Sequence, residues 1–213
     1  MPTGVAMRDA RRQLFDAAER ILLRDGPSAL TSRAVTAEAG CAKGVLHRHF
    51  DDFDGFLAEF VLDRVKRIDA QTAFLRDAAG VGDIVDNLAA ALGGLFDSVA
   101  VAIVPLVTFR DELRARLRRD WPAGVPVLTE AVTLVASYLE DERARGRIAA
   151  DAEVDGLAPM LIGSAHLLFA DRTGPAPGSD DVRAIVERVI GGALRGPTVR
   201  RRRGVSPTNS ARG

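Results

Sequence analysis

The sequence predicts an all-α protein with about nine helices. Apolar residues recur at intervals of three and four along nearly every segment, which is the pattern of amphipathic helices. No stretch combines alternating apolar and polar residues with the turn residues of a hairpin, so no sheet is expected. The 213 residues are 47% hydrophobic and 27% charged, which is typical of a globular chain with a buried core.

Three short or medium helices are expected in the N-terminal part. The first ends at Gly26-Pro27, because glycine commonly ends helices and proline cannot continue one. Thr31 offers an N-cap hydroxyl to a second helix that ends at Gly40, and a third helix follows over residues 42–49. The apolar stripe of the first helix consists of Leu14, Ala18, Ile21 and Leu22.

A long amphipathic helix is expected next, over residues 53–68, and its apolar face contains one polar residue, Arg64. A further helix begins at Ile84 and is ended or kinked by Pro105, and a shorter helical segment follows over residues 106–119. The apolar face of the long helix consists of Phe53, Phe56, Leu57, Phe60, Val61, Val65 and Ile68.

Three more helices are expected after a turn at residues 121–124, and the first of them ends near Gly146. Segment 153–171 is apolar on more than one face, so it must be covered on both sides. After a loop rich in glycine and proline, a last helix spans residues 180–194, with Asp180 as its N-cap. The chain from residue 197 onward is polar and basic, and we expect it to be disordered.

Residues Thr31–Phe50, TSRAVTAEAGCAKGVLHRHF, have the layout of a helix-turn-helix with a glycine at the turn. The net charge of the whole chain is zero, but basic residues exceed acidic ones by eight to five up to Phe50. Inward packing is assigned to Val35, Ala39, Cys41, Leu46 and Phe50. The outward residues, which suit base edges and phosphates, are Lys43, Gly44, Val45, His47, Arg48 and His49.

The same segment resembles the TetR (tetracycline-repressor) family of transcriptional regulators. The resemblance rests on RDGPSALTSRAVTAEAG followed by CAKGVLHRHFDDFDGFL. It implies an N-terminal DNA-binding domain over residues 1–52, in which the outward residues named above form the recognition helix. It also implies an effector-binding and dimerisation domain over residues 53–196, followed by the basic tail over residues 197–213. The residues that the resemblance assigns to phosphate contacts are Thr31, Ser32 and Arg33.

Four positions depart from the pattern of the family. Thr36 stands where alanine usually packs at the helix crossing, and Ala42 replaces the usual serine or threonine cap. The missing cap costs about 1 kcal/mol of local helix stability. His47 replaces the common tyrosine that touches the DNA backbone, and Phe53 stands where a lysine normally holds a phosphate. The last two changes remove anchors for DNA but do not remove the fold.

Segments 153–171 and 180–194 are the candidates for a homodimer interface, because exposed apolar stripes are a liability on a monomer. The family usually dimerises through its last two long helices; the alternative is that both helices complete the monomer core. The helices between Gly82 and Gly146 would enclose a small-molecule effector, which we expect to be apolar or aromatic because charged residues are scarce in their stripes. The candidate lining residues, each of which could also be an ordinary core residue, are Phe96, Phe109, Trp121, Tyr138, Met160 and His166.

Together these features predict a dimeric, ligand-responsive DNA-binding regulator that recognises a palindromic operator. Repression, relieved by the effector, is adopted because it is the commoner mode of the family. The alternative is a helical small-molecule- or partner-binding protein that has lost operator binding.

An enzyme is not expected, because the sequence has neither a glycine-rich phosphate loop nor an HExxH motif. Cys41, His47, His49 and Asp51 lack the paired spacing of zinc ligands, so no metal or cofactor is expected. The single cysteine and the absence of a long apolar stretch predict a cytoplasmic protein.

Overall fold

The computed structural model describes residues 4–96, 99–121, 124–170 and 175–195. Within these ranges the chain forms eleven α-helices, one 3-10 turn and no strand, which confirms the all-α prediction. The elements are α1 (Gly4–Asp25), η1 (Pro27–Ala29), α2 (Ser32–Glu38), α3 (Gly44–His49), α4 (Phe53–Thr72), α5 (Phe74–Asp77), α6 (Ile84–Phe96), α7 (Ala100–Thr108), α8 (Asp111–Leu117), α9 (Pro126–Ala144), α10 (Val154–Ala170) and α11 (Ser179–Ile190).

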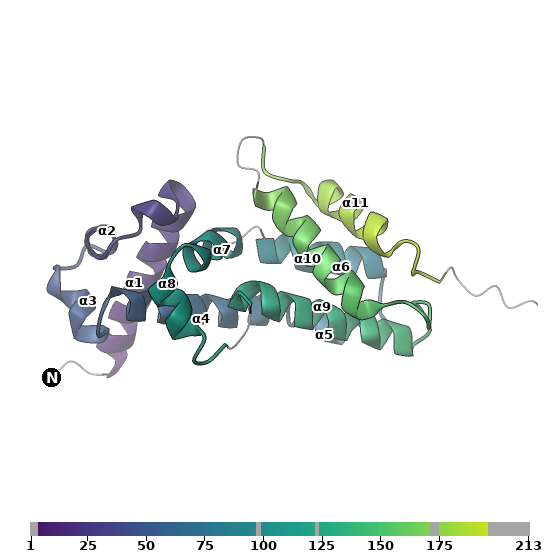
Figure 1. The fold of residues 1–213 in the computed structure, drawn as a ribbon, viewed down its shortest axis with the longest axis horizontal. Coiled ribbons are helices and arrows are strands. Elements are labelled where there is room, and N and C mark those ends of the chain that lie inside the picture. The colour runs from purple at the N-terminus through teal and green to yellow at the C-terminus, as the bar shows by residue number, and fades with distance from the viewer. Residues whose placement is uncertain (1–3, 97–98, 122–123, 171–174, 196–213) are drawn as a thin grey trace, which may run out of the picture.

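The helices are distributed along one long axis (Figure 1). α1, α2 and α3 lie at one end, and α10 and α11 lie side by side in the other half, where they pack on α9 and α6. α4 connects the two halves, because it packs against α3 and also against α6, α8 and α9. α4 therefore has contacts in both halves of the molecule.

The predicted apolar stripes of α1 and α4 are buried. The four stripe residues of α1 are at most 2% exposed. Six of the seven stripe residues of α4 are at most 6% exposed, and only Phe53 is partly exposed. Arg64, the polar residue on the same face, is 1% exposed because its guanidinium pairs with acidic side chains of α1. The face predicted from periodicity is thus the face that packs.

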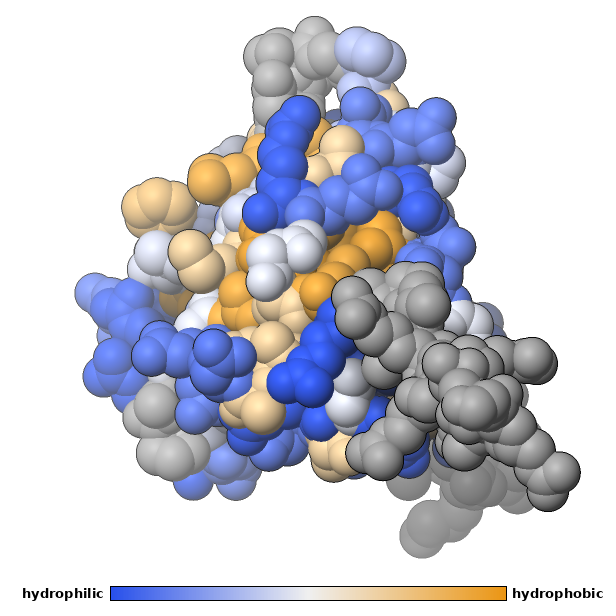
Figure 2. Space-filling model, turned by 90° about the vertical axis from the view of Figure 1, so that its right-hand side faces the viewer, coloured by the Kyte–Doolittle hydropathy of each residue, from blue (hydrophilic) through white to orange (hydrophobic). Residues whose placement is uncertain are grey.

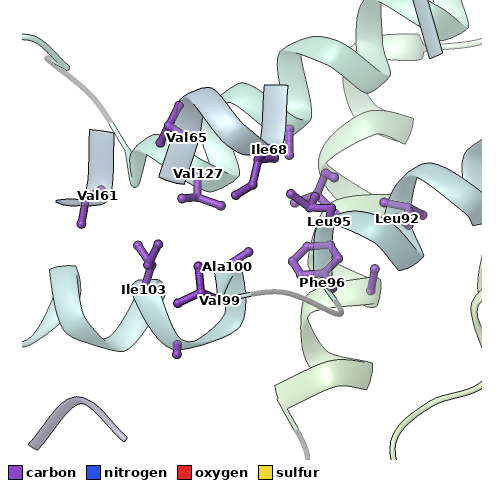
Figure 3. Packing of buried hydrophobic residues seen from close by; sticks show 14 of the residues in the cluster. Val61, Val65, Ile68, Leu92, Leu95, Phe96, Val99, Ala100, Ile103 and Val127 are labelled. Atoms are coloured by element: carbon purple, nitrogen blue, oxygen red, sulfur yellow. The ribbon is translucent and has the colours of Figure 1, made fainter. Parts of the chain in front are cut away.

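Apolar side chains attach α4 to the helices of the larger domain (Figure 3). Val65 and Ile68 of α4 meet Val127 of α9 and Leu95 of α6, and all four are at most 6% exposed. Full burial of such a side chain stabilises the fold by about 1.5–3 kcal/mol. α4 is therefore packed against α6 and α9 as well as against the N-terminal helices.

Pro105 does not end the helix that begins at Ile84, as the sequence suggested. That helix ends at Phe96, and Pro105 lies inside the next helix, α7. Proline has no N–H to donate to the carbonyl four residues earlier and its ring crowds that carbonyl, but its own carbonyl still accepts the amide hydrogen of Phe109 (3.0 Å), and α7 continues past it. The segment predicted over residues 106–119 is accordingly divided between α7 and α8.

The last helix is capped by Asp181 and not by Asp180. The Asp181 carboxylate accepts the amide hydrogen of Gly178 (2.9 Å), because an acidic residue three positions into a helix can reach back to the residue before it. The short helix α5 was not expected, and together with the division into α6, α7 and α8 it raises the number of helices from about nine to eleven. The tail over residues 197–213 lies outside the described residues.

None of the described helices is by itself long and apolar enough to cross a bilayer. α6 and α7 taken together reach that length and apolarity, but the chain bends by 56° between them. Most apolar side chains of both helices are buried in the core.

Candidate nucleic-acid interface

α2 begins and ends as the sequence predicts. The hydroxyl of Thr31 accepts the amide hydrogen of Ala34 (3.1 Å), which is the expected N-cap bond. Gly40 has a φ of 65°, and the amide of Cys41 donates to the carbonyl of Thr36 (2.9 Å). A left-handed residue followed by this bond is a Schellman motif, which turns the chain sharply from α2 into α3.

α3, the predicted recognition helix, is six residues long and is held by its apolar side. The N-cap of α3 is Lys43 and not the predicted Ala42, and no side chain makes a capping hydrogen bond there. Leu46 and Phe50 are buried (0% and 5% exposed), and the ring of Phe50 meets Phe56 of α4 edge-on, with ring centroids 5.0 Å apart. The opposite side of α3 is left free.

The cations around this motif fall into two groups. The described arginines of α1 each form an ion pair with a carboxylate; they are Arg11, Arg12, Arg20 and Arg24. The cations of the helix-turn-helix are exposed and have no ion-pair partner among the described residues; they are Arg33, Lys43 and Arg48. An exposed cation without a partner is available to a phosphate or a base edge. The available positive charge in this part of the described chain therefore lies on the helix-turn-helix.

Glu38 of α2 engages two of the α1 cations. Its carboxylate accepts hydrogen bonds from Arg20 Nε (2.8 Å) and Arg24 Nη1 (3.2 Å). The hydrogen bonds from Arg20 and then Arg24 lower the pKa of Glu38, so the carboxylate is ionised at neutral pH. The charges of both arginines are thus paired with a carboxylate of the protein itself.

Most of the nine residues predicted to contact DNA are exposed; these are Thr31, Arg33, Lys43, Gly44, His47 and Arg48. The other three, Ser32, Val45 and His49, are partly buried; Val45 packs against the core, and the carbonyl of His49 accepts a hydrogen bond from Arg11 (3.1 Å). No group of three His, Cys, Asp or Glu side chains that could hold a metal ion occurs in the described ranges. That these residues contact DNA remains a prediction.

Two of the departures from the family pattern have a packing role. Thr36 is 2% exposed, and its hydroxyl donates to the carbonyl of Ser32 (3.0 Å), so the extra polar atom is satisfied within α2. Phe53 stacks on Phe56, with centroids 5.7 Å apart, and the guanidinium of Arg110 lies 5.4 Å from its ring. Phe53 therefore joins α4 to the larger domain in place of holding a phosphate.

Two ion pairs, which we call the α8 clasp, fasten the start of α4 to α8. Asp52 is the N-cap of α4; it accepts the amide hydrogen of Gly55 (2.7 Å) and pairs with Arg116. Asp54 pairs with Arg110 at the start of α8 (2.9 Å). The Gly55 amide, and then the charge of Arg116, lower the pKa of Asp52, so this pair is charged at neutral pH. The clasp holds α4 directly beside the end of α3.

The six residues predicted to line an effector pocket are not brought together. Phe96 and His166 are neighbours, with ring centroids 5.9 Å apart, and burial lowers the pKa of His166. Tyr138 is 2% exposed, lies toward the C-terminal end of α9, and its hydroxyl accepts a hydrogen bond from Asn87 (3.0 Å). Phe109 (84% exposed) and Met160 (60% exposed) lie on the surface, so within one chain neither lines an enclosed cavity.

A different cavity lies between α4, α6 and α9, and neither Trp121 nor any other predicted residue lines it. Only about 20 Å³ of it is open to water, which is room for about one water molecule. Glu130 is its one charged side chain and has no ion-pair partner among the described residues. The lining residues are Ile68, Thr72, Ala91, Leu92, Leu95, Glu130, Ala131, Leu134 and Val135.

The predicted effector pocket consists mainly of aromatic residues, whereas this cavity contains none. Its walls are aliphatic residues of the predicted stripes, such as Leu92, Leu95 and Leu134. Periodicity shows which face of a helix is apolar, but it does not distinguish a face that meets a cavity from one that meets a filled core. One signal for the cavity is present in the sequence: Glu130 is a charged residue that stands one helical turn from the apolar residues of the α9 stripe.

Comparisons with known proteins bear on both parts of the chain. Residues 14–60 match the family model described as bacterial regulatory proteins, tetR family. A TetR-family regulator from Agrobacterium tumefaciens has a similar structure (TM-score 0.69, 14% identity, 89% of this chain and 100% of that chain). So do a transcriptional regulator from Rhodococcus sp. Rha1 (0.67, 20%, 88% and 99%) and a protein of Saccharomonospora viridis in complex with choline (0.65, 19%, 89% and 100%). No curated protein matches the chain in sequence.

The family model covers only the N-terminal part of the molecule, whereas the similar structures cover most of it. The matched residues 14–60 run from α1 into α4 and contain the whole of α2, the turn at Gly40 and α3. The similar structures extend the shared fold over most of the chain, including the helices that follow α4. Residues 14–60 thus match the model of the tetR family of bacterial regulatory proteins, and the chain as a whole shares the fold of the regulators named above, with a helix-turn-helix at its N-terminus and a helical domain behind it.

Proposed function

We propose that the protein is a repressor that leaves its DNA operator when it binds a small-molecule effector. One observation carries the DNA-binding part: the exposed cations without an ion-pair partner in the described N-terminal helices, Arg33, Lys43 and Arg48, all lie on the helix-turn-helix. An arginine that makes two hydrogen bonds to guanine discriminates by about 1–3 kcal/mol. α3 would read bases, and the start of α2 would bind phosphates.

A homodimer through α10 and α11 would present α3 twice, to successive major grooves of a palindromic operator. Met160 and Leu167 support this interface, because they are 60% and 73% exposed and stand seven residues apart on one side of α10. Exposed Gly163 between them would let a second helix approach closely. Figure 2 shows apolar residues exposed on the end of the molecule away from the N-terminal helices, and Met160 and Leu167 add apolar surface on α10. Pairing two copies would remove this surface from water.

The cavity between α4, α6 and α9 is the site we propose for the effector. It is too narrow for most ligands, so an effector would have to separate these helices and would favour a different conformation. The lining supports a mainly apolar effector, and Glu130 would favour a cationic or hydrogen-bond-donating group over an anion. The Saccharomonospora viridis protein of similar fold is in complex with choline, a small organic cation.

α4 would transmit the effector signal to the DNA-binding helices. Ile68 and Thr72 near its C-terminal end line the cavity, whereas its N-terminal end is fixed by the α8 clasp beside α3. Displacing the C-terminal half of α4 would turn it about the clasp and change the separation of the two α3 helices in the dimer. A coupling of about 1–3 kcal/mol would change operator affinity about 5- to 150-fold, and operator would lower effector affinity by the same factor.

Two observations favour a second function, a ligand- or partner-binding protein that has lost its operator. α3 has no side-chain cap at its N-terminus, and Phe53 packs against Arg110 where the family places a lysine for a phosphate. Both features weaken DNA binding without affecting the larger domain.

Selection of duplexes from a random pool by the purified protein separates the two functions. The proposed repressor enriches one palindromic sequence, whereas a protein without an operator enriches none at low ionic strength. Arg33→Ala and Arg20→Ala are matched variants, because they remove the same charge from neighbouring helices, but Arg20 is already paired with Glu38. Arg33→Ala should weaken operator binding about tenfold and Arg20→Ala much less.

The effector part is tested by the release of that operator. Small alkylammonium compounds, choline among them, should release the operator at lower concentration than alkyl carboxylates of the same length. Glu130→Gln should reduce this preference, and Glu140→Gln, which alters an exposed carboxylate on the same helix, should not. Equal release by cations and anions in both variants would contradict a role for Glu130.

A further inference from the structure

We propose that Arg11 of α1 is a positioning residue that sets how the recognition helix α3 is presented to DNA. The inference rests on the proposed function, in which α3 reads bases, and adds a residue from outside the helix-turn-helix. Arg11 Nη1 donates to the carbonyl oxygen of His49, the last residue of α3 (3.1 Å). Arg11 Nη2 pairs with Glu59 of α4, and the guanidinium carbon lies 4.4 Å from the ring centroid of Phe50. One side chain thus joins α1, α3 and α4.

α3 needs such a contact because it is too short to hold its own geometry. Six residues are far fewer than an isolated helix requires, and no side chain caps the N-terminus of α3. The carbonyl groups at its C-terminus carry partial negative charge and lack partners within the helix. Among the side chains that the structure describes, Arg11 is the one that donates a hydrogen bond to the backbone of α3. It therefore adds a directional hydrogen bond at the end of α3 where Phe50 supplies the apolar packing.

Glu59 and Phe50 orient the guanidinium group of Arg11. The side chains of Arg11 and Glu59 are 33% and 47% exposed, so their ion pair adds little to global stability. Its effect is geometric, because the planar group is held against Phe50 and by Glu59 at once, and Nη1 then faces His49. Lysine has no planar fork and cannot make the three contacts together. Because Glu59 belongs to α4, the same contact would pass a displacement of α4 directly to α3.

Arg12 is a matched control for Arg11. It is the next residue of α1 and carries the same charge, but its side chain is 76% exposed and its ion pair, with Asp16 at 3.8 Å, is within α1. Arg11→Met and Arg12→Met therefore make the same change in net charge. Only Arg11→Met removes a contact with α3.

The experiment compares the affinity of each variant for the selected operator and for a scrambled duplex of equal length, over a range of salt concentrations. Arg11→Met should weaken operator binding about tenfold and binding to the scrambled duplex less than about twofold. Arg11→Lys should behave similarly, because charge alone does not restore the geometry. Glu59→Gln should weaken operator binding about threefold, and the double variant should be no weaker than Arg11→Met, because both act through one contact.

The salt dependence separates positioning from direct contact. If Arg11 bound a phosphate itself, Arg11→Met would lower the slope of log affinity against log salt by about 0.9 relative to Arg12→Met. A positioning residue leaves the two slopes equal, so a lowered slope would overturn the proposal.

An unchanged ratio of operator to scrambled affinity in folded Arg11→Met would also overturn it. Circular dichroism shows whether that variant is folded at the assay temperature; if it is not, Glu59→Gln, which keeps Arg11, decides the question by the same ratio. A wild-type protein with no operator preference contradicts the proposed function itself, and the inference falls with it. A wild type that selects an operator while the variants keep its ratio contradicts only the role of Arg11.

Discussion

Two buried ionic side chains lie in different halves of the molecule, and they are paired to different degrees. Glu142 of α9 is 0% exposed and Arg64 of α4 is 1% exposed. Both carboxylate oxygens of Glu142 accept hydrogen bonds, whereas Nε of Arg64 has no hydrogen-bond partner. A buried charge stabilises a fold only when its pairing is nearly complete. The surroundings of Glu142 are therefore a fixed part of the scaffold, whereas the contacts of Arg64 can be rearranged.

Glu142 closes a network between the end of α9 and the loop before α6. It accepts hydrogen bonds from Arg147 (2.6 Å to each oxygen) and from the amide of Gly80 (3.0 Å), and Arg147 donates in turn to the carbonyl of Gly82 (2.8 Å). Burial favours a raised pKa of Glu142, but the hydrogen bonds from Arg147, Gly80 and Tyr138 outweigh it and lower the pKa. Burial also raises the pKa of Tyr138 to about 12. This network fixes two of the helices that line the cavity, α6 and α9.

Arg64 instead joins α4 to α1 through carboxylates that are partly in water. Its guanidinium lies 3.1 Å from Asp16, 2.8 Å from Glu19 and 2.8 Å from Asp63, and these side chains are 36%, 26% and 40% exposed. α1 and α4 also meet through apolar side chains, among which Phe15 lies against Phe56 and Phe60 with ring centroids 5.6 and 6.0 Å apart. Partly hydrated carboxylates can change partners at low cost, which suits the joint across which the DNA-binding helices would have to move.

The largest effect on the free energy of unfolding is expected in the network around Glu142. Glu142→Gln removes the charge that compensates Arg147 and should lower the free energy of unfolding by about 3 kcal/mol. Glu140→Gln, on the same helix, alters an exposed pair with Arg143 and should cost less than about 0.5 kcal/mol. Denaturant unfolding measures both values. Equal losses in the two variants would show that the buried network contributes no more than a surface pair.

Acidification should remove the same contribution without a substitution. The folded-state pKa of Glu142 is below its ordinary value of 4.5, so the carboxylate stabilises the fold above that pH. The stabilisation should be lost as pH falls from about 4.5 through the lower folded-state pKa. The difference in unfolding free energy between wild type and Glu142→Gln should therefore shrink over this range. A constant difference down to low pH would show that the charge of Glu142 is not what stabilises the network.

A smaller loss of stability is expected where Arg64 joins α4 to α1. Arg64→Met should lower the free energy of unfolding by about 1–2 kcal/mol, because the freed carboxylates can be hydrated and the unpaired Nε is removed at the same time. Arg67→Met is the control, because Arg67 shares Asp16 (3.3 Å) but is 44% exposed. Arg64→Met should also change the coupling between effector and operator, measured as the ratio of operator affinities with and without effector. A stability loss as large as that of Glu142→Gln would show that the joint is as fixed as the network.

The features predictable from the sequence are those that depend on neighbours along the chain. The cap at Thr31, the left-handed turn at Gly40 and the buried stripes of α1 and α4 are confirmed, because each is decided within about one turn of helix. Arg64 was recognised as an interruption, but its partners Asp16 and Glu19 lie on another helix. The sequence carries no marker for such a pairing.

The α8 clasp and the cavity were not predicted for the same reason. Asp52 and Arg116 stand 64 residues apart, and which pairs meet is decided by how whole helices pack. The cavity depends on where aliphatic side chains fail to fill space, which is a property of three helices together. Pro105 lies inside α7 and not at the end of the helix that begins at Ile84, because the apolar pattern shared by α6 and α7 carries no signal for the end of α6 at Phe96.

The smallest effects on stability are expected from Gly40→Ala and Gly146→Ala. This pair of variants also compares the DNA-binding helices directly with the network around Glu142. The two glycines have φ of 65° and 74°, both end a helix with a Schellman motif, and an added Cβ would meet no atom within 4 Å at either. Each substitution should therefore cost about 1 kcal/mol of stability, from backbone conformation alone. Their effects on DNA binding should differ, because Gly40 sets the direction of α3, whereas Gly146 sets that of Arg147 beside Glu142. Operator affinity measured well below the melting temperature should fall for Gly40→Ala and stay at the wild-type value for Gly146→Ala. Equal operator affinities would mean that the turn before α3 does not control its presentation, and that packing at Leu46 and Phe50 alone does.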